Sequence, residues 1–266
     1  MAYISFGTEQ ERQFFETGYL RLGQVVSSDE IQALCGCIDN IMLGQLRYEG
    51  MPMQLDSITG NYKDIPGQTL TFETPSLAYR RIDELWRDPL FLTYMQHPLF
   101  REITLRLIGP DVSVFRAMFM NKPASRGTVL PWHQDVGTGW GLDANPIVTI
   151  WTALDDATVS SGCMQIVPGS HKLGVMNERH FPSEEQIAQH ALEKECIHLE
   201  AEAGEAILIH NFMLHRSQVN DSGRPRRAFS VPYMDAGVQE AKTGRNYPVI
   251  FGKDALIPEF LKLDSL

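Results

Sequence analysis

From about residue 112 the chain consists of short apolar runs, rich in β-branched and aromatic residues and divided by turn-forming residues. In order, these runs are VSVFRAMFMN, IVTIWTALDD, GCMQIVPGS, CIHLEAEAGEAILIH and RAFSVPYMD. Short apolar runs at this spacing are typical of strands in an antiparallel sandwich or barrel. This half of the chain therefore predicts a mostly β fold with helical elaborations.

The residues before this region show helical periodicity instead. TEQERQFFET predicts a helix that ends before Gly18 and is followed by a brief strand, and SSDEIQALCGCIDNIMLGQL predicts a helix with Ser27 or Ser28 as its N-cap. HPLFREITLRLIGPD predicts a third helix, which Gly109 and Pro110 end. Residues 51–78 have little periodicity, so we expect a loop there with at most a short strand.

These patterns predict one domain over residues 1–266, a length that a β-barrel with added helices often reaches. We expect helical support over about 1–111, a β core over about 112–235 and a C-terminal extension over 236–266. The polar stretch MNERHFPSEEQIAQHALEKE, at 176–195, predicts an insertion with a helix over one end of the barrel.

Charge and composition exclude several classes of partner. The formal net charge of −10 disfavours nucleic acid or an anionic membrane, although a local basic pocket for a small anion is compatible with it. No apolar run is long enough to span a bilayer, and the first residues lack the pattern of a signal peptide, so we expect a cytoplasmic location. The cysteines lack CxxC spacing and are expected to be reduced.

The stretch LPWHQDVGTGWG contains a histidine and an aspartate two residues apart. On a strand His133 and Asp135 face the same way, while Gln134 points elsewhere. An imidazole and a carboxylate can therefore enter one cavity. With eight histidines in the chain, this pair alone is a weak indication of a metal site.

A second histidine and an arginine strengthen the metal hypothesis. The strand AILIH leads into a turn that bears His215, and a later strand begins with Arg226 or Arg227. Two histidines and one carboxylate are the donors of the facial triad that binds non-haem Fe(II) and leaves positions open for a 2-oxoacid and O₂. An arginine deeper in the cavity matches the far carboxylate of such a cosubstrate.

Together, the His-x-Asp pair, LHRSQVNDSGRPRRAF and VPGSHKLG resemble the phytanoyl-CoA dioxygenase (PhyH) family of Fe(II)/2-oxoglutarate oxygenases. The resemblance runs from FFETGYLRL to about residue 235. It implies a double-stranded β-helix, the cupin-like jelly roll, which agrees with the strand pattern. It also implies Fe(II), 2-oxoglutarate and O₂ as cofactors, with His133, Asp135 and His215 as the iron ligands.

The resemblance further implies residues that bind the cosubstrate. Arg226 would pair with the distal carboxylate of 2-oxoglutarate, Ser217 would hydrogen-bond the same carboxylate, and Trp151 would line the pocket. Arg81 falls where relatives offer a basic residue to the cosubstrate, with Arg80 as the alternative.

The activity expected from this resemblance is hydroxylation of an unactivated C–H bond in a small molecule, with release of succinate and CO₂. Related halogenases replace the carboxylate ligand by a small residue, so Asp135 favours hydroxylation, while desaturation, epoxidation and cyclisation use the same ligands. Two alternatives stay open. One is a non-catalytic jelly roll that binds a small molecule, a metal or 2-oxoglutarate, and the other is a cupin-like enzyme with another metal and no 2-oxoacid.

Position alone suggests residues of the substrate pocket, listed here as Trp140, Phe119, Tyr233 and Arg116. The remaining histidines are not expected to bind the metal. His210 lies five residues before His215, so an uninterrupted strand would turn it to the opposite face, and it is expected in the wall or just outside the ligand set. His171 is expected to fix a turn. His180 and His190 are expected to be solvated within the insertion, which is a candidate lid.

Strand alternation also predicts the orientation of the remaining arginines and sulfur-containing residues. If Arg226 points inward, Arg227 points outward, and Arg224 is expected to be solvent-facing or structural. Four residues are expected mainly in the core, with one or two of them lining the cavity: Met118, Met120, Cys163 and Met164.

Overall fold

The computed structural model describes residues 5–124, 127–178, 180–190, 194 and 196–261. Its α-helices are α1 (Thr8–Thr17), α2 (Ser28–Met42), α3 (Pro89–Met95), α4 (Pro98–Leu107) and α5 (Glu184–Gln189). Its strands are β1 (Tyr19–Gln24), β2 (Met53–Leu55), β3 (Tyr79–Ile82), β4 (Val112–Val114), β5 (Met118–Lys122), β6 (Leu130–His133), β7 (Val148–Ala153), β8 (Met164–Ile166), β9 (Ile197–Leu199), β10 (Glu205–His210), β11 (His215–Ser217), β12 (Arg226–Asp235) and β13 (Val249–Phe251). Short 3₁₀ turns lie at Tyr62–Asp64, Leu85–Arg87, Thr138–Trp140, Ser170–Leu173 and Pro258–Phe260.

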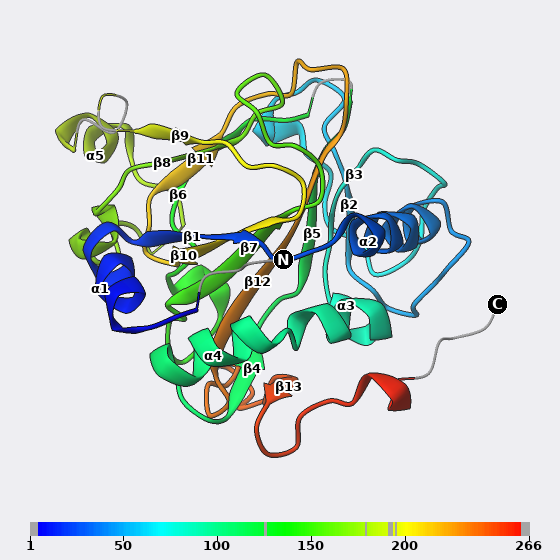
Figure 1. The fold of residues 1–266 in the computed structure, drawn as a ribbon. Coiled ribbons are helices and arrows are strands. Elements are labelled where there is room, and N and C mark those ends of the chain that lie inside the picture. The colour runs from blue at the N-terminus through cyan, green and yellow to red at the C-terminus, as the bar shows by residue number, and fades with distance from the viewer. Residues whose placement is uncertain (1–4, 125–126, 179, 191–193, 195, 262–266) are drawn as a thin grey trace.

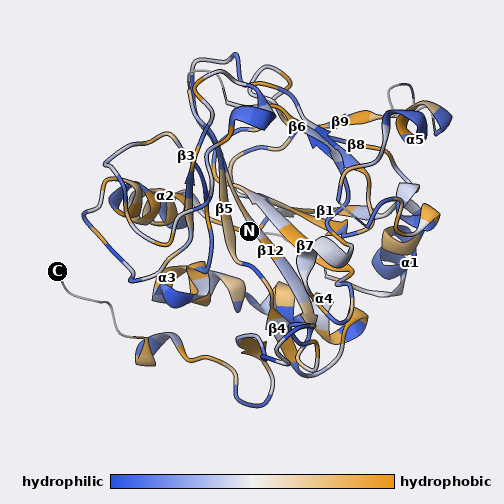
Figure 2. Ribbon diagram, turned by 180° about the vertical axis from the view of Figure 1, so that it is seen from behind, coloured by the Kyte–Doolittle hydropathy of each residue, from blue (hydrophilic) through white to orange (hydrophobic). Residues whose placement is uncertain are grey.

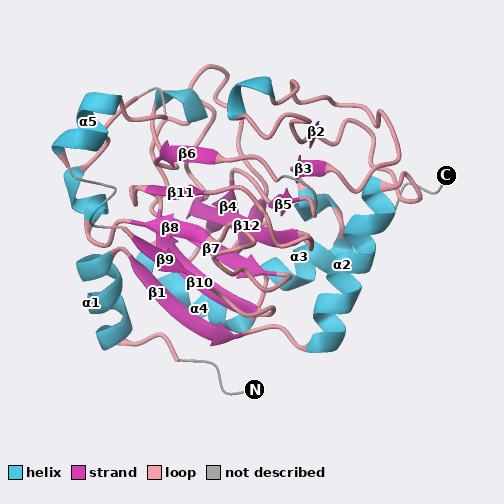
Figure 3. Cartoon of the chain, turned by 90° about the horizontal axis from the view of Figure 1, so that it is seen from above, coloured by secondary structure: helices cyan, strands magenta, loops and turns pink. Residues whose placement is uncertain are grey.

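The strands form two antiparallel sheets. The larger has nine strands, of which seven follow the order β1-β10-β7-β12-β5-β3-β2, while β4 joins beside β12 and β13 joins β4. The smaller has the order β6-β11-β8-β9 and forms a separate layer beside the larger sheet (Figures 1 and 3). Two facing antiparallel sheets agree with the predicted jelly roll.

Strand alternation gives the larger sheet two different faces. On β7, β10 and β12, residues such as Ile150, Leu208 and Phe229 belong to one core cluster with α2, α3 and α4. Their neighbours Trp151 and Ile207 belong to a second cluster, shared with the smaller sheet. The helices α2, α3 and α4 therefore cover the outer face of the large sheet (Figure 1). Apolar residues lie on both faces of its central strands, and Figure 2 shows the same elements coloured by hydropathy.

The three helices expected from sequence periodicity are confirmed, and their ends have local causes. Gly18 ends α1 in the left-handed conformation at φ 81°, and its N–H donates to the carbonyl of Phe14. Ser27 caps α2 by accepting from the N–H of Glu30, whose carboxylate accepts from the N–H of Ser27. Such a reciprocal capping box satisfies two N–H groups that the first helical turn leaves free.

Several elements were not expected from the sequence. The strand β3 lies within residues 1–111 and extends the large sheet together with β1 and β2, the two short strands that were expected there, and β13 pairs with β4 from within the C-terminal extension. The helix α3 begins at Pro89, and the side chain of the preceding residue, Asp88, caps its N-terminus. The helix α3 has only seven residues, which is too short for a recognisable helical periodicity. The strand β3 has the sequence YRRI, and its two arginines make it differ from the apolar runs that predict strands.

Two further expectations concern the cysteines and membrane-spanning segments. The four cysteines are free, as predicted, and burial raises the pKa of Cys35 to about 11. Among the described residues, no helix combines the length and apolar character that crossing a membrane requires.

We expect Phe229→Ala to lower the free energy of unfolding by about 3–5 kcal/mol, the usual cost of deleting a buried phenylalanine ring. Phe229 is fully buried on the outer face of β12, with its ring centroid 4.9 Å from that of Phe91. Urea denaturation measures the change. Phe260→Ala is the matched control because Phe260 is 78% exposed, and an equal loss in both variants would contradict this packing.

Candidate metal centre and cosubstrate cavity

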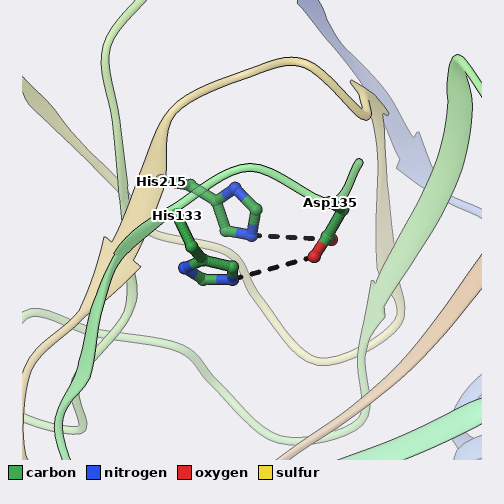
Figure 4. Close-up of side chains that lie close together, drawn as sticks. All are labelled: His133, Asp135 and His215. Atoms are coloured by element: carbon green, nitrogen blue, oxygen red, sulfur yellow. Dashed lines mark ion pairs between the residues drawn. The ribbon is translucent and has the colours of Figure 1, made fainter. Parts of the chain in front are cut away.

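Three predicted residues meet at one point between the sheets. His133 ends β6 and His215 begins β11, and these two residues are paired directly opposite each other in the antiparallel ladder. Asp135 follows β6, with its two oxygens 3.8 Å from Nε2 of His133 and 3.6 Å from Nε2 of His215 (Figure 4). Potential ligand atoms of the three residues all lie within 4.8 Å of one another, close enough to surround one ion.

Both imidazoles are held so that Nε2 faces Asp135. Nδ1–H of His133 donates to the carbonyl of Pro131 at 2.8 Å, and Nδ1–H of His215 donates to the carbonyl of Met213 at 2.9 Å. A ring whose Nδ1 carries the proton presents the lone pair of Nε2, which is the donor that a metal needs. Burial, and then the neighbouring imidazoles His215 and His180, lower the pKa of His133 well below its usual value, which favours the neutral form.

The backbone around Asp135 is fixed by a residue that sequence reasoning missed. The N–H of Asp135 donates to the carbonyl of Asn211 at 2.9 Å, and the Asn211 amide donates back to the carbonyl of Asp135. Thr149 donates to the other end of the Asn211 side chain. Asn211 lies in HNFMLH, between two histidines, and its polarity inside an otherwise apolar run was the available signal.

Gln134 points away from the two ligand candidates, as strand alternation predicts. Its amide donates to the carbonyls of Gly174 and Phe212, and its oxygen accepts from the N–H of Met176. Gln134 therefore ties the start of the 176–195 insertion to the strand that carries the site.

Arg226 and Arg227 point to opposite sides of β12, as predicted. Arg227 forms a bidentate ion pair with Asp155 and a further one with Asp39. Arg226 is 6% exposed and donates from Nη2 to the carbonyl of Gly162. Within the part of the chain that the structure describes, its buried Nε has no hydrogen-bond partner. Burial lowers the pKa of Arg226 to about 10.

A side pocket continues the cavity at the Arg226 end. Ser217 and Arg80 line it with Arg226, as does Lys122, which is opposite Arg226 in the sheet. Lys122 is buried and donates from Nζ to the carbonyl of Thr128; burial, and then the charge of Arg226, lower its pKa well below the usual value. Asp56 also lines this side pocket, 3.9 Å from Arg80, but the basic side chains outnumber it, so this end of the cavity suits a carboxylate.

The main cavity holds about 950 Å³ of space not filled by protein atoms, including its open mouth. The sequence-predicted residues that line it are His133, Asp135, His215, Arg226, Ser217, Trp151, Arg81, Trp140, Arg116 and His210. Arg80 lines it as well, so both candidates at that position reach the cavity, and Arg81 is already paired with Asp83 by two hydrogen bonds.

Two predicted pocket residues lie in the core instead. Phe119 and Tyr233 are fully buried on the outer face of the large sheet, and the Tyr233 hydroxyl donates to the carbonyl of Met95. Strand alternation is the reason. Met118 and Met120 point into the cavity, so Phe119 between them points out, and Tyr233 lies an odd number of residues from Arg226.

The expectation that His180 is solvated was also wrong. His180 lines the cavity, with its ring centroid 4.8 Å from that of His133, and burial lowers its pKa. His180 has a left-handed backbone conformation, with φ 82°, and its carbonyl accepts a hydrogen bond from the N–H of Gln134. These two features direct its side chain into the cavity. His190 ends α5 and is not among the described lining residues.

His171 and the sulfur-containing residues also have defined positions in the structure. His171 bonds the carbonyl of Phe15 and so joins two segments rather than fixing its own turn. Cys163 packs in the inner core, while three methionines line the cavity, more than the one or two expected: Met118, Met120 and Met164. Of the glycines after Asp135, Gly137 leaves room for the insertion, since a Cβ there would lie 3.0 Å from the carbonyl oxygen of Glu178.

Comparison with known proteins extends this description. The chain is 25% identical over 239 residues to the peroxisomal phytanoyl-CoA dioxygenase of Bos taurus, covering 86% of this chain and 68% of that protein. It is 24% identical over 277 residues to a probable alpha-ketoglutarate-dependent hypophosphite dioxygenase of Stutzerimonas stutzeri, covering 96% and 90%. The crystal structure of EctD from S. alaskensis with 2-oxoglutarate and 5-hydroxyectoine has a similar fold, with a TM-score of 0.67, 21% identity, and coverage of 96% and 83%.

The jelly roll and its His-Asp-His donor set define a non-haem Fe(II)/2-oxoglutarate-dependent dioxygenase. The family model "Phytanoyl-CoA dioxygenase (PhyH)" matches residues 14–228, most of the chain. The chain therefore belongs to the PhyH family, whose members act on small molecules. The residues present fit the cofactors, because neutral imidazoles and a carboxylate suit Fe(II) and the unpartnered Nε of Arg226 suits a carboxylate.

We expect the two neighbouring arginines to differ in their effect on stability. Arg227→Met breaks charged hydrogen bonds to Asp155 and should lower the free energy of unfolding by about 1.5–3 kcal/mol. Arg226→Met removes a buried charge that has no carboxylate partner, so the ligand-free protein should be equally or more stable. Urea denaturation of both variants measures this, and a larger loss in Arg226→Met would contradict it.

Proposed function

We propose that His133, Asp135 and His215 hold Fe(II), and that Arg226 and Ser217 bind the distal carboxylate of 2-oxoglutarate beside Trp151. The enzyme would hydroxylate an unactivated C–H bond of a small molecule and release succinate and CO₂. The convergence of the three donors in one cavity with a buried arginine carries this proposal. A one-domain chain and a cytoplasmic location stay predictions.

The residues of the chain contribute geometry and charge. The carbonyls of Pro131 and Met213 hold both imidazoles in the tautomer that offers Nε2, and Asn211 fixes the backbone of Asp135. Fe(II) with 2-oxoglutarate would supply the oxidation of the substrate by O₂. The protein then orients the substrate and excludes water from the cavity.

Arg226 supports cosubstrate binding because its charge is otherwise poorly compensated. Its Nε has no partner, and the neighbouring cation Lys122 is hydrogen-bonded to a backbone carbonyl. A carboxylate at this end would accept charge-assisted hydrogen bonds and neutralise the buried charge. Of the two candidates on β3 we propose Arg80 as the neighbour of this carboxylate, because Arg80 shares the side pocket with Arg226 while Asp83 engages Arg81.

Asp135 supports oxygen transfer to the substrate. A carboxylate at this position fills the coordination site that halide takes in related halogenases. The alternative of a non-catalytic binding protein has less support, since binding alone does not require three metal donors together with a buried arginine.

The direct test measures succinate formation with Fe(II), O₂ and 2-oxoglutarate, over a panel of small molecules and without any of them. Succinate that depends on added Fe(II) supports the proposal. Bound metal with no turnover, even uncoupled from substrate, would favour the binding protein.

We expect Arg226→Ala to raise the KM for 2-oxoglutarate by about 10–100-fold, which corresponds to losing a charge-assisted hydrogen bond of about 1.5–3 kcal/mol. Initial rates of succinate formation against 2-oxoglutarate concentration measure the change. Arg224→Ala is the matched control because Arg224 is exposed two residues earlier. An unchanged KM in Arg226→Ala would refute the assignment.

We expect Asp135→Ala to weaken Fe(II) binding by more than about 100-fold, because even partners outside the coordination sphere contribute about 10–100-fold. Anaerobic calorimetry with Fe(II) measures the affinity. Asp143→Ala removes an exposed carboxylate eight residues away and should bind Fe(II) as the wild type does. Equal affinity in Asp135→Ala and the wild type would exclude Asp135 as a ligand.

A further inference from the structure

The cavity wall carries far more positive than negative charge. Among the described residues that line it, five are arginines (Arg80, Arg81, Arg116, Arg216 and Arg226) and one, Asp135, is acidic. The whole chain has the opposite balance, with a formal net charge of −10. The cations are therefore concentrated where ligands bind.

Arg116 differs from most of these arginines in having no polar partner. Among the residues that the structure describes, its guanidinium forms no hydrogen bond or ion pair, and its contacts are with the rings of Phe115 at 4.5 Å and Trp140 at 5.2 Å. By contrast, Arg81 is paired with Asp83, and Arg80 has Asp56 at 3.9 Å and a hydrogen bond to Gln54.

The acidic groups near Arg116 are already engaged. Asp83 accepts two hydrogen bonds from Arg81 and one from Gln68, and Asp135 faces the two histidines. Burial, and then the charge of Arg81, lower the pKa of Arg116 to about 10. Arg116 thus remains protonated at neutral pH but is poorly compensated, an arrangement that is costly unless a ligand supplies the counter-charge.

Arg116 and Arg226 lie at opposite ends of the cavity. Arg226 is opposite Lys122 at the end of β5, whereas Arg116 lies two residues before Met118, where β5 begins. The strand between Met118 and Lys122 spans about 13 Å. Arg116 also lines an outer cleft with Phe115 and Tyr247, whereas Arg226 lines the inner side pocket. The short five-carbon cosubstrate bound at Arg226 therefore leaves Arg116 free.

We propose that Arg116 binds an oxyanion of the primary substrate, a carboxylate or a phosphate ester, so that the substrate class is a small organic anion. This inference rests on the proposed function, because it assumes that 2-oxoglutarate occupies the Arg226 end. Phe115 and Trp140 hold the planar guanidinium by stacking, which leaves its N–H groups free for the anion.

The experiment observes the arginine Nε–Hε resonances by NMR in protein loaded with Zn(II), which does not turn over, and 2-oxoglutarate. The Arg116 resonance is assigned by its absence in Arg116→Gln, and Arg116→Lys provides a second assignment if the glutamine variant does not fold. The probes are benzoate, phenyl phosphate and the neutral benzamide. The two anions separate a carboxylate site from a phosphate site.

We expect the Arg116 resonance to shift saturably with benzoate or phenyl phosphate and not with benzamide. Arg116→Gln should weaken binding of that anion by at least about tenfold, the loss of one charge-assisted hydrogen bond. Arg245→Gln is the matched control, since Arg245 also stacks on an aromatic ring in the outer cleft but is paired with Glu240. It should bind the anion as the wild type does.

Two results would overturn the inference. One is an Arg116 resonance that moves with no anion or moves equally with benzamide. The other is a loss of 2-oxoglutarate affinity in Arg116→Gln as large as that in Arg226→Ala, which would make Arg116 a cosubstrate residue. Failure of the proposed metal and cosubstrate sites is distinguished beforehand, because wild-type protein would then bind neither Zn(II) at the three donors nor 2-oxoglutarate. Failure of the proposed catalysis alone is distinguished by the succinate assay, which gives no turnover while anion binding at Arg116 is unaffected.

Discussion

The pairing of β6 with β11 is the constraint on which the site depends. It sets His133 directly opposite His215, although 82 residues separate them in sequence. In an antiparallel ladder a slip of one residue turns every side chain to the other face, so the ligand set exists in one register only. The backbone carbonyls that orient the two imidazoles come from the residues two positions earlier in each segment. The same local geometry therefore positions both rings and sets their tautomers.

A second constraint is electrostatic and concerns the cavity. Burying a guanidinium without a carboxylate costs free energy, and among the described residues neither the buried Arg226 nor the half-buried Arg116 has such a partner, while the neighbouring Arg227 is paired with Asp155. Because Arg227 has Asp155 and Asp39 within reach, the fold is able to compensate a charge at this place in the sheet. The absence of such partners at the cavity end of β12 is then a property of the binding site, where ligands are expected to supply the negative charge.

Much of this was predictable from sequence, and the errors have identifiable physical causes. The helices with clear caps and the β-rich half followed from local patterns that the fold preserves. The choice of the three donors and of Arg226 over Arg227 came from the family resemblance, and strand alternation required only that these two arginines point to opposite sides. Phe119 and Tyr233 were misplaced although alternation from Met118 and from Arg226 points both outward. His180 was not predictable in this way, because a left-handed residue held by Gln134 depends on contacts between distant segments. Asn211 was missed although its polarity inside an otherwise apolar run between two histidines was an available signal.

Alternation along the large sheet also separates the requirements of stability from those of chemistry. On β12, Phe229, Val231 and Tyr233 fill the core beneath the helices, while Arg226 and Ser230 line the cavity. Substitutions on the first set act through packing, and substitutions on the second act through ligand binding. The cavity residues are therefore free to change with the substrate while the outer face retains the fold. Arg116 and Trp140 line the cavity but lie outside β6 and β11, the paired strands that carry the two histidines, so residues that would contact a substrate can vary while the proposed metal donors stay in place.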